Sequence, residues 1–416
     1  MVNSAYTVFK PNGTVVTGPY NINGPFDEGL TEFTSDPRCH YDAATHTWYA
    51  TILFINSSNT QSRVDLAVNT TGDPTKAWTT YRIDTTDTGG QTGPRHPGCP
   101  CLGDQPTLGI DADNVYITTN EFSLQGPQFN GAQVYAVPRS ELVAAGPSAT
   151  PAHFVHFDNL NIGGNVATSV QPALTTGTAP AEYFLNSLDP NGTFDQRIGV
   201  WAMTNRTQIA QGVRPTLSSI VSPSEAYGVP PNGEQKGSTS LISSGDDRMQ
   251  QVQYIGGHVL GALDSSVTIP GDSTARAGAA WFDAQPSLSA NTISGATLRQ
   301  GYVVLSGNYL MYPAIQRAPD GKTVLVMSLS AANRYPSAVY SVLNSGASSF
   351  GPVNLVAGGT GPYDPTATRW GDYSWSVLDP SGQSIWGATE YIPRKSSQTP
   401  DGKANWGTRV FEVPTP

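Results

Sequence analysis

Charged residues are scarce in this chain. Only 13% of its 416 residues are Asp, Glu, Lys or Arg, and acidic residues outnumber basic ones by 32 to 22. The net charge of -10 leaves no basic stripe that could neutralise phosphates, so we expect no nucleic-acid partner. Because charges are so few, the surface must be rich in Ser, Thr, Asn and Gln.

Long apolar runs and nucleotide-binding motifs are missing as well. No run reaches the roughly 18 apolar residues that a membrane-spanning helix needs, so we expect no membrane partner. Gly256-Gly257 lies inside an expected hairpin instead of between a strand and a helix, and no Gly-x-Ser-x-Gly motif occurs. Hydride transfer, kinase chemistry and serine-hydrolase chemistry are therefore disfavoured, and we expect no required cofactor.

No signal peptide is visible, because Met1-Val2-Asn3-Ser4 leads directly into a strand-like segment. A cytoplasmic protein is one interpretation. Few lysines and abundant Thr, Ser and Asn favour the other, a mature secreted chain that carries a starting Met. We expect a secreted monomer.

Turn-forming residues are abundant. Gly (43) and Pro (33) make up nearly a fifth of the chain without a collagen-like period, which is typical of many short strands joined by turns. The only convincing helical start is residues 138–143, which predicts one or two helical turns in a loop.

A two-strand pattern recurs six times. Its anchor residues are Pro37, Pro106, Pro172, Arg248, Pro313 and Tyr373, separated by steps of 69, 66, 76, 65 and 60 residues. A step of this size suits one four-stranded sheet with its loops, and the closed form of such a repeat is a propeller. We therefore expect one all-β domain over residues 1–416, a propeller of six four-stranded blades. A seventh blade within the 76-residue step is the alternative.

Each copy predicts a hairpin followed by two weaker strands. The clearest hairpins join residues 37–42 to 48–54, 106–111 to 115–119, 314–318 to 323–327, and 374–378 to 385–389. The last copy ends after one further strand, at residues 408–413. Residues 13–22 are similar in sequence to residues 350–355. We therefore expect this N-terminal strand to complete the last blade and close the ring.

Carboxylates recur at two positions of the pattern. In a propeller, the loop before each first strand and the loop after each second strand lie on one face, around the axis. The positions before the first strands carry Asp36, Asp104, Asp246, Asp247 and Asp372. The positions after the second strands carry Asn56, Glu121, Asn186, Asp264 and Glu390. We expect these side chains to gather at one mouth of the channel.

A pair of carboxyl groups can divide the roles of acid and base or nucleophile. The candidate catalytic residues are Asp36, Asp104, Glu121, Asp372 and Glu390. The candidate substrate-binding residues are Arg38, His40, Arg248 and Arg369, with Trp370, Tyr373 and Tyr391 as stacking surfaces. The alternative for each Asp is a turn cap that accepts a backbone N–H bond. A ring of Asp could also hold a structural Ca²⁺.

Three cysteines form the second constellation. We expect one disulfide, from Cys39 to Cys99 or Cys101, which leaves an odd thiol. The alternative is a Zn²⁺ or copper site formed by Cys39 or His40 with His96, Cys99 and Cys101.

Three segments carry a resemblance to a known class of proteins. Ser35-Asp36-Pro37-Arg38, Gly103-Asp104-Gln105-Pro106 and Arg369-Trp370-Gly371-Asp372-Tyr373 resemble the hairpins of secreted bacterial β-propellers of the sialidase-like and glycosidase-like kind. The sialidase Asp-box is not met, because residues 379–386 have one residue too many between Asp and Gly. The resemblance implies a fold, and it assigns no catalytic residue.

The leading hypothesis is a secreted carbohydrate-active enzyme that hydrolyses a glycan with a carboxylate pair. One alternative is a polysaccharide lyase that uses His40 or Tyr373 as base, with Arg38, Arg248 and Arg369 neutralising a uronate. The other is a non-catalytic propeller that binds glycans or proteins at the same mouth.

Overall fold

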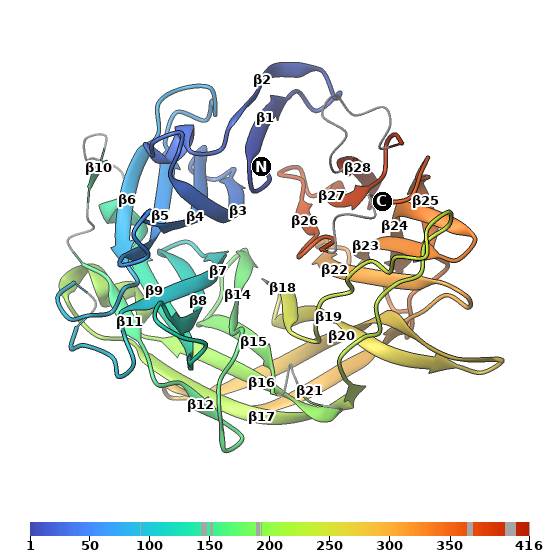
Figure 1. Cartoon of the computed structure of the whole chain (residues 1–416). Coiled ribbons are helices and arrows are strands. Elements are labelled where there is room, and N and C mark those ends of the chain that lie inside the picture. The colour runs from blue at the N-terminus through green and yellow to red at the C-terminus, as the bar shows by residue number, and fades with distance from the viewer. Residues whose placement is uncertain are drawn as a thin grey trace. The chain divides into compact units, whose positions relative to one another are not determined.

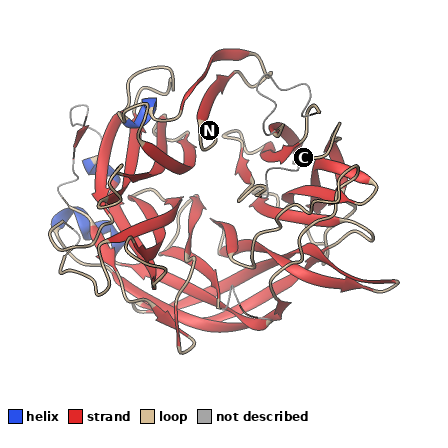
Figure 2. Ribbon diagram, viewed as in Figure 1, coloured by secondary structure: helices blue, strands red, loops and turns tan. Residues whose placement is uncertain are grey.

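The computed structural model describes residues 1–91, 93–142, 148–149, 153–188, 192, 194–363, 369–395 and 405–415. Within these residues the chain is all-β, with three short 3-10 helices between its strands (Figure 2). None of the described helices has the length and apolar character needed to cross a membrane. The chain forms two compact units. Unit 1 is Met1–Leu174, Pro180–Glu182 and Met203–Leu217, and unit 2 is Thr175–Ala179, Tyr183–Ala202 and Ser218–Pro416.

Unit 1 contains two larger groups of strands that pair antiparallel in chain order (Figure 1). The first comprises β3 (Phe33–Asp42), β4 (Thr47–Ile55), β5 (Ser62–Asn69) and β6 (Thr79–Asp84), with β10 (Ser148–Ala149) added parallel to β6. The second comprises β7 (Cys101–Ile110), β8 (Asn114–Ser123), β9 (Phe129–Pro138) and β11 (Val155–Phe157). Apolar side chains of both sheets share one buried core, which includes Tyr49, Leu66, Ile117 and Tyr135. Two half-buried sheet faces thus cover one another, as blades do.

The tight turn of the β7–β8 hairpin shows how short polar side chains set these strands. Asp111 Oδ1 accepts the backbone N–H of Asp113 at 2.8 Å and of Asn114 at 2.7 Å. Its other oxygen accepts the hydroxyl of Tyr116 and pairs with the guanidinium of Arg206. The carboxylate therefore stabilises the turn and holds the buried guanidinium of Arg206 in place.

Four further strands follow in chain order, and the chain passes between the units within them. They are β14 (Gln171–Thr176), β15 (Glu182–Ser187), β16 (Asp195–Thr204) and β17 (Thr216–Tyr227). In unit 1, Leu174 of β14 bridges in parallel to Ile110 of β7, so the first strands of two successive copies lie side by side. That arrangement is expected where sheets follow one another around an axis.

Unit 2 continues the same pattern. One set of strands is β18 (Met249–Ile255), β19 (His258–Ile269), β20 (Asp272–Ser289) and β21 (Thr292–Val303). The next is β22 (Tyr309–Arg317), β23 (Thr323–Ala331), β24 (Arg334–Leu343) and β25 (Asn354–Ala357). The last is β26 (Trp375–Leu378), β27 (Ser384–Tyr391) and β28 (Gly407–Pro414). The expected hairpins of the first, second, fifth and sixth copies are confirmed. Between β17 and β18, the described residues form only an isolated bridge, Gly233 to Ile242, and not a further sheet.

The expected partner of the N-terminal strand is wrong. Strand β2 (Val15–Asn21) pairs antiparallel with β1 (Ala5–Phe9), and the two form a separate two-stranded sheet. Residues 5–9 form a strand, and the turn residues Pro11-Asn12-Gly13 follow them. The two neighbouring strands therefore form a local hairpin. The remaining elements are small: η1 (Gly24–Phe26), η2 (Arg139–Glu141), η3 (Arg206–Gln211), β12 (Asn161–Ile162) and β13 (Asn165–Val166). The expected helical start at residue 138 is thus one 3-10 turn, and residue 143 lies outside the described residues.

Candidate functional site

The residue before the anchor has an unusual backbone in four of the six copies. Asp36, Gln105, Tyr312 and Asp372 have positive φ angles of 55°, 50°, 54° and 120°. At the first three, the pairing register shifts between the flanking residues, which marks a bulge in the first strand. A bulge redirects a side chain, and strained non-glycine residues gather at functional positions. The position before each anchor residue, called a column of the repeat below, is therefore a candidate for a functional site.

The first copy contributes mainly packed residues. Asp36 is half-buried, and its backbone N–H donates to Asn3 Oδ1 at 3.1 Å. Arg38 is 6% exposed. Burial lowers the pKa of His40 to about 4, so this ring is neutral at pH 7. Asp104 in the second copy is half-buried and lies opposite Asn120 in the β7–β8 pairing.

Glu121, near the end of β8, lies at the centre of a buried polar cluster in unit 1. Its carboxyl oxygen Oε2 lies 2.8 Å from His96 Nδ1 and accepts a hydrogen bond from Gln133 Nε2 at 2.9 Å. The pKa of Glu121 is raised to about 7, mainly by burial; His96 opposes the rise, and the charges of Asp87 and Asp158 contribute to it. Glu121 is 1% exposed, so a sugar chain cannot reach it from solvent.

The loop from residue 84 to residue 101 supplies the other members of this cluster. It is folded on itself by backbone hydrogen bonds from His96 to Asp87 (3.1 Å) and from Cys99 to His96 (3.3 Å). Donor atoms of Asp87, His96, Cys99 and Glu121 all lie within 4.8 Å of one another, and all four residues are buried. Asp87 also forms a second such group with His156 and Asp158.

The expected disulfide pairing is wrong. Cys99 and Cys101 are bonded to one another, and Cys39 is the free cysteine. Cys39 packs beside the cluster of Ile22, Phe26 and Ala50, where burial raises the pKa of its thiol to about 11. The expected metal set is corrected in the same way, because His96 and Cys99 meet Asp87 and Glu121 in place of Cys39 and His40.

Glu390, near the end of β27 in unit 2, occupies the position in its sheet that Glu121 occupies in the second sheet. Its Oε2 accepts the backbone N–H of Gly371 at 3.0 Å. Burial raises the pKa of Glu390 to about 7, and the charge of Asp372 adds to this effect. Unlike Glu121, Glu390 retains some exposure to solvent.

The two candidate arginines of unit 2 are both engaged. Arg369 donates from one nitrogen, Nη2, to both carboxylate oxygens of Asp372 at 2.8 and 2.9 Å, and its side chain is 81% exposed. Arg248 pairs with Asp246 at 2.6 Å. Each guanidinium therefore has an adjacent carboxylate that balances its charge.

Tyr312 and Asp264 complete the group around Glu390. Tyr312 is 3% exposed, and burial together with the charges of Asp264, Asp372 and Glu390 raises the pKa of its phenol. Asp264 is fully buried, and its Oδ1 accepts the backbone N–H of Tyr312 at 2.8 Å. Burial raises the pKa of Asp264 well above its usual range, and Asp246 and Asp247 contribute to the rise. Asp264 thus interacts with the charges of Asp246 and Asp247, and Tyr312 with those of Asp264, Asp372 and Glu390.

Among the expected stacking residues, Trp370 is not available. It is 2% exposed and packs edge-on against Tyr363 in a buried cluster. Tyr373 and Tyr391 are half-buried. Trp370 is therefore a core residue, whereas the two tyrosines keep exposed surface.

Sequence reasoning missed Asp87, Gln133, His156 and Tyr312. The spacing of Asp87, His96 and Cys99 within one loop was a signal for the unit 1 cluster. Tyr312 precedes its anchor residue as Asp36 and Asp372 do, but its side chain carries no charge that would mark it as a site residue.

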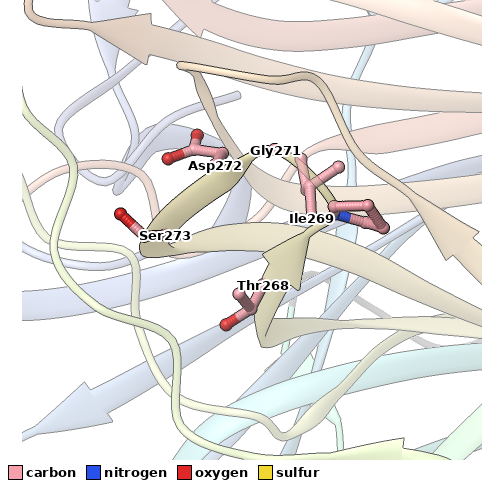
Figure 3. Close-up of a pocket in the computed structure, with 6 residues that line it drawn as sticks. Thr268, Ile269, Gly271, Asp272 and Ser273 are labelled. Carbon is pink, nitrogen blue, oxygen red and sulfur yellow. The ribbon is translucent and has the colours of Figure 1, made fainter.

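One concavity lies at the β19–β20 turn of unit 2 and is lined by none of the candidate site residues. It is open and lined by Thr268, Ile269, Pro270, Gly271, Asp272 and Ser273 (Figure 3). Asp272 binds Arg276 and the N–H groups of Gly307 and Thr274, which lower its pKa to about 2. Its carboxylate thus holds the turn together, and no set of polar groups converges on the hollow.

No protein-family model matches the chain, and no curated protein matches it. Among solved structures, it is similar in architecture to sialidase-like and glycosidase-like propellers. The phage phi92 endosialidase shares 9% identity over 91% of this chain and 66% of that chain, with a TM-score of 0.47. A Trypanosoma rangeli sialidase shares 10% identity over 98% of this chain and 58% of that chain, with a TM-score of 0.45. An α-L-arabinofuranosidase from Fusarium graminearum shares 11% over 99% and 97%, with a TM-score of 0.39. The chain thus spans about two thirds or less of the two sialidase chains, and the likeness concerns architecture alone.

Proposed function

We propose that this chain is a secreted, monomeric glycoside hydrolase built as a six-bladed propeller, with Glu390 and Asp372 as its catalytic pair. One observation carries the proposal. These two carboxyl groups interact electrostatically but have opposite surroundings, because burial raises the pKa of Glu390 to about 7 while Asp372 is the anionic partner of Arg369. Two neighbouring carboxyl groups with different protonation states are what glycosidic cleavage requires.

Their surroundings assign the two roles. Glu390 is the general acid, which gives its proton to the leaving glycosidic oxygen. Asp372 acts on the other side of the sugar, either as nucleophile or by taking a proton from the attacking water. Its backbone has a positive φ, and Arg369 Nη2 contacts both of its carboxylate oxygens, which favours one orientation of the side chain.

The substrate proposed is a neutral glycan. A uronate lyase would need cationic side chains to neutralise the sugar carboxylate, but Arg248 and Arg369 already balance Asp246 and Asp372. With a net charge of -10, the chain offers little further attraction to an acidic polysaccharide.

The test is a screen of purified protein against neutral and acidic polysaccharides. New reducing ends are measured together with the ultraviolet absorbance of an unsaturated uronate. Glu390→Gln keeps the shape of the side chain but cannot supply a proton, and Glu412→Gln, at an exposed position on β28, is the matched control. We expect reducing ends with wild type and Glu412→Gln, and almost none with Glu390→Gln.

Other outcomes would replace the proposal. Ultraviolet absorbance without loss in Glu390→Gln would indicate a lyase that uses a different residue. Saturable glycan binding with no cleavage by wild type would indicate a binding propeller.

A further inference from the structure

We propose that unit 1 holds a redox-gated zinc site formed by Asp87, His96 and Glu121, with Cys99 as a fourth ligand that becomes available when the Cys99–Cys101 disulfide is reduced. This site is independent of the Glu390–Asp372 pair proposed above.

Burial and convergence are the first observations. The donor atoms of the four residues lie within 4.8 Å of one another, and each residue is 5% exposed or less. Zinc bonds to nitrogen, oxygen and sulfur are roughly 2.0–2.3 Å long, so four ligand atoms around one ion are all mutually close. Only small side-chain movements are needed to place these four donors around a Zn²⁺ ion.

The protonation of His96 is the second, independent observation. His96 Nε2 lies 3.0 Å from Asn159 Oδ1, an acceptor, so the ring proton belongs on Nε2. His96 Nδ1 then presents a lone pair, is buried, and makes no hydrogen bond. It nevertheless lies 2.8 Å from a Glu121 oxygen, a second electron-rich atom. Two electron-rich atoms this close need a positive charge between them, which a proton supplies in the metal-free protein and which a bound Zn²⁺ would replace.

Further side chains hold the ligands in place. Gln133 donates from Nε2 to Glu121 and its Oε1 contacts His156 Nε2. His156 in turn stacks on the ring of Tyr135 with 4.6 Å between centroids. Asn159 fixes the ring of His96. Metal ligands are oriented by outer hydrogen bonds of this kind, whereas a group of chance contacts lacks them.

Cys99 provides the gate. Its Sγ lies 3.3 Å from Glu121 Oε1, inside the group, but a disulfide sulfur has no thiolate charge with which to bind zinc. A dithiol reductant would be oxidised to its own disulfide and would leave one thiol on Cys99 and one on Cys101. Binding of Zn²⁺ would then release the Cys99 proton to solvent.

The donor set selects the metal. One imidazole nitrogen, two carboxylate oxygens and one thiolate match the tetrahedral ligands of Zn²⁺, and no open coordination position remains in the reduced form. Ca²⁺ and Mg²⁺ prefer oxygen ligands only, so they should compete poorly.

The experiment measures Zn²⁺ binding by titration calorimetry, with and without a dithiol reductant, after removal of metal by chelator. Cys101→Ser leaves Cys99 as a permanent thiol, Cys99→Ser removes it, and Cys39→Ser controls for the free cysteine. We expect one Zn²⁺ per chain, bound at least tenfold more tightly by reduced than by oxidised wild type. Cys101→Ser should bind tightly without reductant, Cys99→Ser should not respond to reductant, and Cys39→Ser should behave as wild type.

A spectroscopic readout distinguishes ligation from a folding effect. Co²⁺ bound to Cys101→Ser should show a sulfur-to-cobalt charge-transfer band that Cys99→Ser lacks, and His96→Gln should lose tight binding while its circular dichroism stays unchanged. Equal affinities of oxidised and reduced wild type, or a Co²⁺ complex without this band, would overturn the role of Cys99. Absence of Zn²⁺ binding in folded Cys101→Ser would overturn the site as a whole.

Discussion

Glu121 and Glu390 occupy corresponding positions near the ends of β8 and β27, and burial raises the pKa of both to about 7. Their neighbours differ. Glu121 is 1% exposed and contacts His96 and Gln133, whereas Glu390 keeps solvent contact and receives one backbone donor, from Gly371. The comparison teaches that the loop covering a strand end decides what a carboxyl group there can do. A folded loop encloses the first group, whereas the second keeps contact with solvent.

The strongest test of this difference is catalytic. Glu390→Gln should lower kcat for glycan cleavage by about 10²–10⁴-fold, because the general acid is lost and the shape of the side chain is kept. The measurement is the initial rate of reducing-end release, with Glu412→Gln as control. An equal loss in both variants would show that the effect is structural.

For the free energy of unfolding we expect the opposite order, with the larger loss on substitution of Glu121 and the smaller loss on substitution of Glu390. In chelator-treated protein, Glu121→Ala should lower the free energy of unfolding by about 2–3 kcal/mol, because Gln133 Nε2 loses its acceptor in a buried place. Glu390→Ala should cost less than about 1 kcal/mol, since solvent can reach the vacated Gly371 N–H. Urea unfolding of the two variants compares these values directly. The distinction between the two regions fails if both losses are the same.

The pH dependence of stability should reveal the buried proton of Glu390. A carboxyl whose pKa is raised from 4.5 to about 7 stabilises the fold fully below pH 4.5 and loses that contribution as the pH rises to about 7. The charged group that acts on it is Asp372. Wild type should therefore lose about 1–3 kcal/mol relative to Glu390→Gln between pH 4 and pH 8. Parallel stability curves for the two proteins would refute the raised pKa.

The smallest effect concerns the open rim of the Glu390 region. Arg369 is 81% exposed, so Arg369→Ala should change the free energy of unfolding by no more than about 0.5 kcal/mol. If Arg369 orients Asp372, cleavage should still fall several-fold, mainly through kcat, and Arg369→Lys should recover part of it. Loss of stability without loss of activity would remove Arg369 from the proposed site.

The sequence predicts the repeat and its columns well, because turn residues and alternating strands have local physical causes. Asp111 sets the β7–β8 turn through its own backbone neighbours, and the bulges fall one residue before the anchors Pro37, Pro106 and Pro313. The gathering of Asp246, Asp264 and Glu390 within unit 2 follows from this alignment.

The unit 1 cluster could not be predicted in the same way. Its shape depends on how residues 84–101 fold on themselves, and backbone hydrogen bonds such as His96 to Asp87 leave no trace in residue types. The sequence therefore favours a disulfide from Cys39 to Cys99 or Cys101, whereas Cys99 pairs with Cys101, two residues away. The partner of β2 was missed for a related reason, since pairing with the adjacent β1 costs less chain entropy than pairing with a distant strand.

The Cys99–Cys101 bond has a consequence for the unfolded chain. A cross-link restricts the denatured ensemble in proportion to the logarithm of the loop that it closes, and this loop contains only Pro100 between the two cysteines. The entropy removed corresponds to only about 1–2 kcal/mol, well below what a bond across a hundred residues would give. Reductant should therefore lower the melting temperature by only a few degrees. We expect the reduced protein to stay folded at room temperature, so the thiol of Cys99 can be tested in the native state.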